Sequence, residues 1–297
     1  MQNVCLKAFQ PEARLEILVA ETTDACREAQ TLHQLAPTSA VAFGRLLTGA
    51  SLLAIQNKQP GSLSLQILSQ ARIKSMFADC THEGHLRGYA KETTLAFPLS
   101  ASERTSGRRT VGAAVAPGKL SIVRLDAEGR YGQSATPLVD GEIDTDLEHF
   151  IDRSDQVDNA LRIEVRLDDL GRITRAAGVL IQALPDGDRS HLAELRQKLH
   201  EGLLADQLIR GMEAQELLTA IDAQATPVDQ PLPLRWRCRC SHERVLRSLV
   251  LFEVQGLMEL IEADEPVEVR CDLCTKTFSV SVDEIRTILE KVIKAQA

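Results

Sequence analysis

Residues Thr38 to Ile55, TSAVAFGRLLTGASLLAI, restrict how this chain can fold more than any other segment. The run starts with residues that favour a helix N-terminus, and Arg45 is its only charged side chain. A helix that is apolar on nearly every face must be buried on nearly every face. Its glycine, serine and threonine content makes a membrane span unconvincing. The sequence therefore predicts a core helix with packed layers on both sides.

The rest of residues 1–185 shows strands, turns and short helices. Two segments with alternating apolar and polar side chains predict an opening pair of strands, and three later stretches, each with Asp and Gly between two apolar or β-branched runs, predict β-hairpins. We therefore expect an α+β fold, a β/α/β layered domain around the buried helix. The two strands are Val4–Phe9 and Arg14–Ala20, the hairpins lie within 74–90, 121–135 and 163–179, and helices are expected over Thr22–Leu35 and Gly141–Ser154.

The pattern changes after Pro185. Leucine and isoleucine recur at helical spacing from Arg189 to Ile221, with Gly202 and Gly211 as breaks, and the following stretch ATPVDQPLPL carries three prolines. We therefore predict a helical linker region over 186–234. A last module over 235–297 should contain helices at Glu243–Phe252, Val254–Glu262 and from Asp283.

Two tight cysteine pairs lie in this last module. The first is C-x-C, the second is C-x-x-C, and 30 residues separate them. Four sulfurs complete a tetrahedral zinc shell, which indicates a structural Zn²⁺ ion, one per chain in the reduced form, held by Cys238, Cys240, Cys271 and Cys274. The alternative is four unliganded core cysteines. His242 could replace one sulfur, but with the shell complete we expect it beside the site or at the surface.

The spacing of the first pair also indicates redox sensitivity. A disulfide between cysteines one residue apart closes a strained ring, and strained disulfides are labile. Nearby arginines favour thiolate, although acidic residues of the module nearly neutralise them, so charge tuning and a plain mixed surface are equally supported; these arginines are Arg235, Arg237, Arg239, Arg244 and Arg270. Cys5 and Cys26 are expected to be buried, and Cys80 with His82 and His85 lacks a fourth ligand for a metal site.

Composition disfavours several classes of partner and activity. Against 34 Lys and Arg stand 42 Asp and Glu, a net charge of −8, and aromatic residues make up only 3%. Binding to nucleic acid or to anionic membranes is therefore not expected. We find neither a secretory leader nor a run of about 18 apolar residues, so a cytoplasmic location with reduced cysteines is expected. The motifs of zinc hydrolases, serine hydrolases and phosphate-binding loops are absent, which argues against an enzyme.

Two other functions fit paired cysteines. A thiol-disulfide oxidoreductase would place Cys271 and Cys274 at a helix N-terminus, but strand-like VEVR and TFSVSV flank them here and favour a zinc knuckle. A zinc-ribbon regulatory or nucleic-acid-binding protein would need a basic, aromatic-bearing face. The net charge and the lone Trp236 speak against it.

Taken together, these segments resemble the 33 kDa chaperonins, the family of redox-regulated heat-shock holdases. The resemblance rests on CRCSHERVLRSLVLF, ADEPVEVRCDLC and KTFSVSVDEI near the end, and on LAPTSAVAFGRLLTGASLL, GHLRGYA, GEIDTDLEHFIDRSDQ and AAGVLIQALP before them. It covers essentially the whole chain. Two stretches depart from the family pattern, Leu68–Lys74 and Glu103–Arg109.

The resemblance implies a chaperone of the oxidative stress response that holds unfolding proteins without ATP. It implies that zinc holds four thiolates in an inactive reduced form. Peroxide with unfolding, or hypochlorous acid, would expel the zinc and form the disulfides 238–240 and 271–274, and the active form would be a homodimer. We expect the helices between Arg189 and Ile221 to loosen when the zinc leaves and to expose apolar surface to clients.

Overall fold

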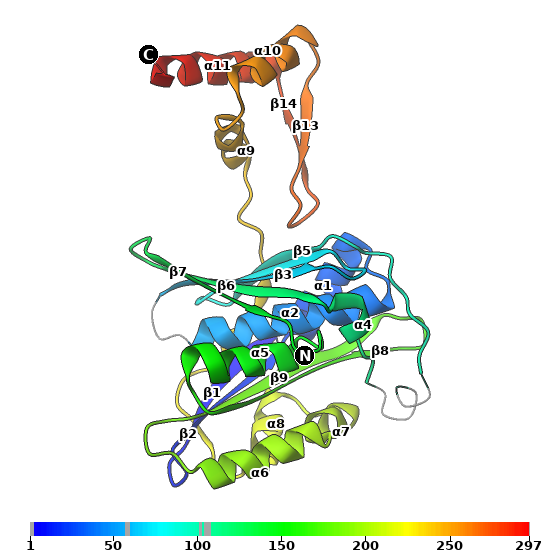
Figure 1. Cartoon of the computed structure of the whole chain (residues 1–297), viewed down its shortest axis with the longest axis vertical. Coiled ribbons are helices and arrows are strands. Elements are labelled where there is room, and N and C mark those ends of the chain that lie inside the picture. Colours follow the sequence, from blue (N-terminus) through cyan, green and yellow to red (C-terminus); the bar gives the residue numbers. More distant parts are fainter. Residues whose placement is uncertain (1–2, 57–59, 101–102, 104–107, 297) are drawn as a thin grey trace. The chain divides into compact units, whose positions relative to one another are not determined.

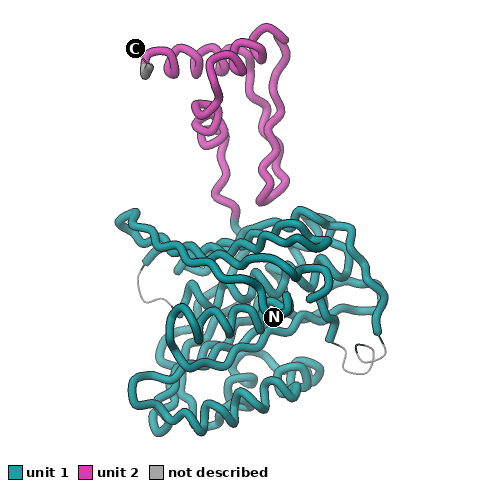
Figure 2. Tube along the Cα trace, viewed as in Figure 1, with its two compact units in different colours: residues 1–237 teal, residues 238–297 magenta. Residues whose placement is uncertain are grey.

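The computed structural model describes residues 3–56, 60–100, 103 and 108–296. Its chain forms two compact units, residues 1–237 and 238–297 (Figure 2). The sequence predicts three regions, with boundaries after residues 185 and 234. This division stays a prediction. By its contacts, the segment between them belongs to the first unit.

Sheet A is the first of two sheets in unit 1. Its strand order is β10-β1-β2-β9-β8, and β11 also pairs with β1. Leu18 and Ala20 face one side of this sheet while Ile17 and Val19 face the other, and both sides are buried. The strands are β1 (Val4–Gln10), β2 (Leu15–Glu21), β8 (Asn159–Leu167), β9 (Ile173–Ala183), β10 (Thr226–Pro227) and β11 (Leu232–Pro233).

Sheet B is the second, with the order β12-β5-β4-β3-β6-β7. The hairpins β4–β5 and β6–β7 belong to it, and β8–β9 belongs to sheet A, so all three predicted hairpins are confirmed. Its strands are β3 (Gly61–Ser69), β4 (Ser75–Thr81), β5 (His85–Ala90), β6 (Gly118–Asp126), β7 (Tyr131–Pro137) and β12 (Arg235–Trp236).

Helices α1 (Thr23–His33) and α2 (Pro37–Gln56) fill the space between the sheets (Figure 1). Every residue of α2 from Thr38 to Ala54 is buried, as its sequence predicts. By length and composition α2 is apolar enough to cross a membrane, but 94% of its most apolar window is buried in the fold. At Gly178 of β9 a side-chain carbon would lie 2.8 Å from Thr48 of α2, so glycine allows this close approach. The β/α/β arrangement around a buried helix is confirmed.

A further helical layer covers the other face of sheet A (Figure 1). Helices α6 (Arg189–His200), α7 (Leu203–Ile209) and α8 (Ala214–Ile221) bury their leucines against Ile17, Val19, Val179 and Ile181. Gly202 and Gly211 have positive φ and separate the three helices, as predicted. Among its described residues, unit 1 also contains the helices α4 (Gly112–Val115) and α5 (Asp144–Phe150) and the π-helix η1 (Ile151–Asp155).

Unit 2 is a small module with its own core. It contains α9 (His242–Leu249), α10 (Val254–Glu262), the antiparallel strands β13 (Val267–Arg270) and β14 (Thr277–Val280), and α11 (Val282–Gln296). Leu257, Phe278, Val280 and Ile285 are among its buried residues, and Cys240 and Cys271 pack against them. The core is too small to make the module independent of other stabilisation.

Candidate metal centre

The four cysteines of unit 2 come from two pieces of chain. Cys238 and Cys240 lie just before α9, where the Ser241 hydroxyl accepts a hydrogen bond from the Arg244 N–H at 3.2 Å and starts the helix. Cys271 and Cys274 lie in the turn between β13 and β14. That turn is closed by hydrogen bonds from the Cys271 N–H to the Lys276 carbonyl and from the Thr275 N–H to the Cys271 carbonyl. The predicted strands on both sides of C-x-x-C are confirmed.

Folding brings the four sulfurs together. All lie within 4.8 Å of one another, with 3.8 Å between the Sγ atoms of Cys238 and Cys271 and 3.3 Å between those of Cys240 and Cys274. In a tetrahedral site with Zn–S bonds of about 2.3 Å, sulfurs lie ~3.8 Å apart. The donor set and its spacing therefore fit a zinc ion held by four thiolates.

The thiols of the cluster influence one another. Burial alone raises the pKa of Cys238, but hydrogen bonds from the Cys240 N–H and from the neighbouring thiols outweigh it, so this pKa lies below the usual range. Burial, followed by hydrogen bonds to Cys274 and Cys238, raises the pKa of Cys240. Burial also raises the pKa of Cys274, although hydrogen bonds with the Lys276 N–H and with Cys240 oppose it. Four negative sulfurs cannot share so small a space unless a cation compensates them, which is what a bound Zn²⁺ supplies.

His242 is engaged elsewhere. Its Nε2 lies 2.6 Å from Oε1 of Glu284, at the start of α11. The hydrogen bond with His242, followed by those from the Ser281 N–H and hydroxyl, lowers the pKa of Glu284 to about 2. His242 therefore links the start of α9 to the start of α11 beside the cluster, and it is not among the four side chains that could hold the metal.

The remaining cysteines are buried in unit 1. Burial raises the pKa of Cys5 to about 12 and that of Cys26 to about 11, and it keeps that of Cys80 well above the usual range. These groups stay protonated, which makes them poor nucleophiles. Among the described residues, Cys80, His82 and His85 do not form a metal-binding group.

The arginines predicted around the cysteines are divided between the two units. Arg235 and Arg237 belong to unit 1, where Arg237 lies 3.3 Å from Nε2 of His85. Arg239, Arg244 and Arg270 are exposed in unit 2.

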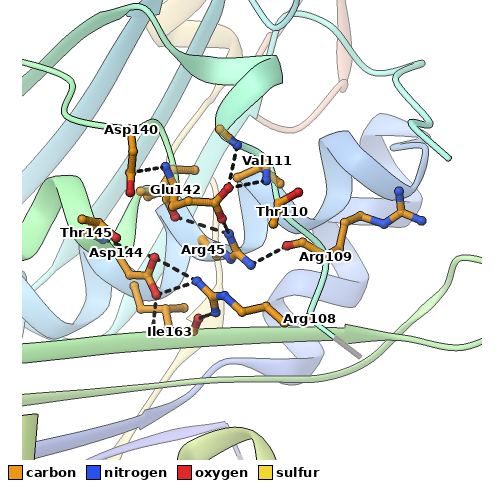
Figure 3. Close-up of polar contacts among 12 residues, drawn as sticks. Arg45, Arg108, Arg109, Thr110, Val111, Asp140, Glu142, Asp144, Thr145 and Ile163 are labelled. Carbon is orange, nitrogen blue, oxygen red and sulfur yellow. Dashed lines mark hydrogen bonds and ion pairs between the residues drawn. The ribbon is translucent and has the colours of Figure 1, made fainter. Parts of the chain in front are cut away.

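A buried charge cluster lies in unit 1 (Figure 3), and its one signal in the sequence is Arg45, the single charged residue of the predicted core helix. Arg45 of α2 is fully buried; it lies 2.6 Å from the Glu142 carboxylate and donates to the Arg109 carbonyl at 2.6 Å. Arg108 contacts the Asp144 carboxylate at 2.9 Å and the Glu164 carboxylate at 2.5 Å. Arg108 belongs to Glu103–Arg109, one of the two stretches that depart from the family pattern. Residues 104–107 of that stretch lie outside the described residues, but Arg108 contacts buried side chains of the core.

The family model described as "Hsp33 protein" matches residues 3–281. Among curated relatives, the 33 kDa chaperonin of Thermus thermophilus is 32% identical over 97% of this chain and 86% of its own length. That of Symbiobacterium thermophilum is 32% identical over 96% of both chains. This chain belongs to the Hsp33 family.

Members of the Hsp33 family are chaperones, and so is this chain. The crystal structure of the 33 kDa chaperonin from Thermotoga maritima matches with a TM-score of 0.84 at 22% identity, over 99% of this chain and 100% of that one. That likeness shows that the Hsp33 fold covers both units.

Proposed function

We propose that this protein is a redox-regulated holdase that binds unfolding proteins without ATP in the cytoplasm during oxidative stress. The cluster of four cysteines within 4.8 Å of one another carries the proposal. Zn²⁺ would be held by Cys238, Cys240, Cys271 and Cys274, with no position left for a substrate. When bound, the ion supplies positive charge and a crosslink between two pieces of chain. Its role is therefore structural and regulatory rather than catalytic.

Oxidation of the cysteines is expected to release the zinc ion and so to remove the crosslink between the two pieces of chain. Hydrogen peroxide accepts two electrons from a pair of thiolates. An S–S bond forms, the O–O bond of the peroxide breaks, and two protons from the solvent complete two molecules of water. A disulfide sulfur is a far weaker zinc ligand than a thiolate, so each bond formed removes two ligands. Because the small core of unit 2 depends on the crosslink, loss of zinc unfolds the module.

We expect oxidation to join Cys238 to Cys240 and Cys271 to Cys274. In the folded site the sulfurs are also close across the pairs, at 3.8 and 3.3 Å, so distance alone does not select partners. Once zinc has left and the module has opened, cysteines one or two residues apart meet far more often than cysteines about 30 residues apart. Peptide mapping of oxidised protein tests this. A dominant link between Cys240 and Cys271 would contradict it, and Cys5, Cys26 and Cys80 should stay reduced.

We expect clients to bind in the linker region 186–234, at helices α6 to α8, and on the face of sheet A that these helices cover. Isolated helices this short are unstable in water, and these three depend on the leucines that they bury against sheet A. Their release would uncover apolar residues such as Ile17 and Val179, which bind unfolding chains by non-directional burial. The active form is expected to be a homodimer.

Hydrogen exchange tests this opening directly. After peroxide treatment and zinc release, amides in residues 189–235 should lose protection by at least tenfold, while the buried helix α2 keeps its protection. The reduced, zinc-loaded protein is the reference. Unchanged protection over 189–235 would rule out the opening even if the oxidised protein were an active holdase.

Light scattering of an aggregating protein tests the function itself. Peroxide-treated protein, without ATP, should suppress the aggregation of chemically unfolded citrate synthase at near-equimolar ratio. The reduced, zinc-loaded protein should suppress it weakly. Equal suppression by both forms would contradict redox regulation, and no suppression by either would contradict the holdase proposal.

A further inference from the structure

The edges of the two sheets are protected unequally. An edge strand carries a row of unpaired N–H and C=O groups that can template pairing with another chain, and proteins usually cover or charge such edges. In sheet A the edge of β1 is covered by β10 and β11. In sheet B the edge of β5 is covered by β12. The two remaining edges are β8 and β7, and they differ.

The edge of β8 is covered by charged side chains. Carboxylates of α5 accept its amide hydrogens: Asp144 from the Ile163 N–H at 3.3 Å, and Glu148 from the Leu161 N–H at 3.1 Å. Two arginines donate to its carbonyl groups, Arg108 to Ile163 and Arg196 to Asn159. The backbone groups that would bind another strand are therefore already occupied.

The edge of β7 has no such cover. At one end of the β6–β7 pair the Leu138 N–H donates to the Gly118 carbonyl, and at the other end the Asp126 N–H donates to the Arg130 carbonyl. Because hydrogen-bonded pairs alternate along an antiparallel ladder, the even-numbered residues of β7 point their backbone groups toward β6. The amide and carbonyl groups of Tyr131, Gln133 and Ala135 consequently point away from the sheet. Within the described part of the chain, no hydrogen bond reaches them.

Pro137 lacks an amide N–H and closes the last position of this edge, but the side chains of residues 131–136 do not protect the rest. Residues 131–137, YGQSATP, carry no charge. Tyr131 is 73% exposed, and its neighbour across the pair, Leu125 of β6, is 44% exposed, so apolar surface adjoins the open edge. The β6–β7 hairpin also projects past the helical layer of unit 1 (Figure 1). Among the described residues of unit 1, no strand covers this edge.

We propose that the β7 edge binds extended, uncharged segments of unfolding polypeptides by adding them to sheet B as a further strand. This inference rests on the proposed holdase function and names one way in which a client is bound. Strand addition is driven by main-chain hydrogen bonds that every polypeptide can make, so it requires no sequence motif. It gives one weak contact, which the apolar surface uncovered by oxidation would supplement.

A second copy of the chain is the less favoured occupant. Two edges of seven residues would pair over a small area, whereas stable interfaces bury about 1,200–2,000 Å² in total. A short, uncharged edge suits transient binding of many different segments better than it suits a stable dimer.

The variant Ala135→Pro tests the proposal. Proline removes an N–H that points away from β6, so the pairing between β6 and β7 is preserved. Gln133→Lys, a second variant, places a charge on the same edge. Gln133→Val is its matched control because it replaces the same side chain without adding a charge. The probe is a fluorescein-labelled heptapeptide of alternating threonine and valine. The same peptide N-methylated at every residue, whose methyl groups block both edges of a strand, is the control ligand.

With the reduced, zinc-loaded full chain, we expect the unmodified peptide to bind and the N-methylated peptide not to bind. Ala135→Pro and Gln133→Lys should each weaken binding at least tenfold, and Gln133→Val should not. Equal binding of both peptides, no binding to the wild type, or no effect of either edge variant would overturn the proposal. A concentration-dependent dimer that Ala135→Pro abolishes would assign the edge to a second copy instead and overturn it too. The peptide-binding assay uses reduced protein, whereas the light-scattering assay of the holdase function uses oxidised protein. A failure of the holdase proposal can therefore be distinguished from a failure of the strand-addition proposal.

Discussion

Replacing Cys271 and Cys274 by serine is expected to remove zinc from the protein and to unfold residues 238–297, while residues 1–185 stay folded. A serine hydroxyl does not replace a thiolate as a zinc ligand. Zinc contributes about 10–16 kcal/mol to the folding of small zinc modules, whereas a core of this size contributes ~3–5 kcal/mol. The cysteines pack directly against that core, so losing the metal also loosens its packing.

Metal analysis and hydrogen exchange measure the two effects. The double variant should contain less than about one tenth of the wild-type zinc, and its amides in β13, β14 and α11 should exchange at the rate of unfolded chain. Cys80→Ala, which alters a buried thiol of unit 1, is the control and should keep one zinc per chain. Equal zinc in the double variant and the wild type would show that the ligands lie elsewhere.

Replacing Arg108 by methionine should destabilise unit 1 by about 3–5 kcal/mol, because it leaves two buried carboxylates without their main partner. Asp144 is 0% exposed and Glu164 is 1% exposed. Arg162 stays near them, at 3.6 and 3.3 Å, but cannot replace the two hydrogen bonds that Arg108 donates to Asp144. Urea unfolding monitored by the hydrogen exchange of α2 measures the loss.

Arg130→Met is the matched control. The Arg130 side chain is 73% exposed and pairs with Asp126 at the surface, so its loss should cost less than about 1 kcal/mol. A similar effect of both variants would show that the buried cluster contributes no more than a surface ion pair.

The effect of Arg108→Met should depend on pH. Burial raises the pKa of Asp144, but Arg108, Arg45 and Arg162 outweigh it, so this pKa lies below its unfolded value. A carboxyl group whose folded pKa is depressed stabilises the protein above its unfolded pKa of about 4, and this stabilisation disappears as the pH falls through the folded pKa. The difference in unfolding free energy between wild type and variant should therefore shrink as the pH falls below about 4.

Local sequence patterns determined much of the architecture. The apolar run of α2 required burial on all sides, and Asp and Gly at the turns identified three hairpins, all of which are present. The spacing of the four cysteines identified a cluster that the structure brings together. These features follow from the sequence because each depends on neighbouring residues, through helical period, turn conformation or ligand spacing.

Tertiary structure alone decided which distant side chains meet. Arg45 pairs with Glu142, 97 residues further along the chain, and Arg108 lies 56 residues before its partner Glu164. Tertiary structure alone also decided that His242 pairs with Glu284. The same holds for the β8 edge being covered while the β7 edge is open. Each depends on the order of strands in a sheet and on the side on which a helix packs. Periodicity reports only which face of an element is buried, and it carries no information about the element that covers that face.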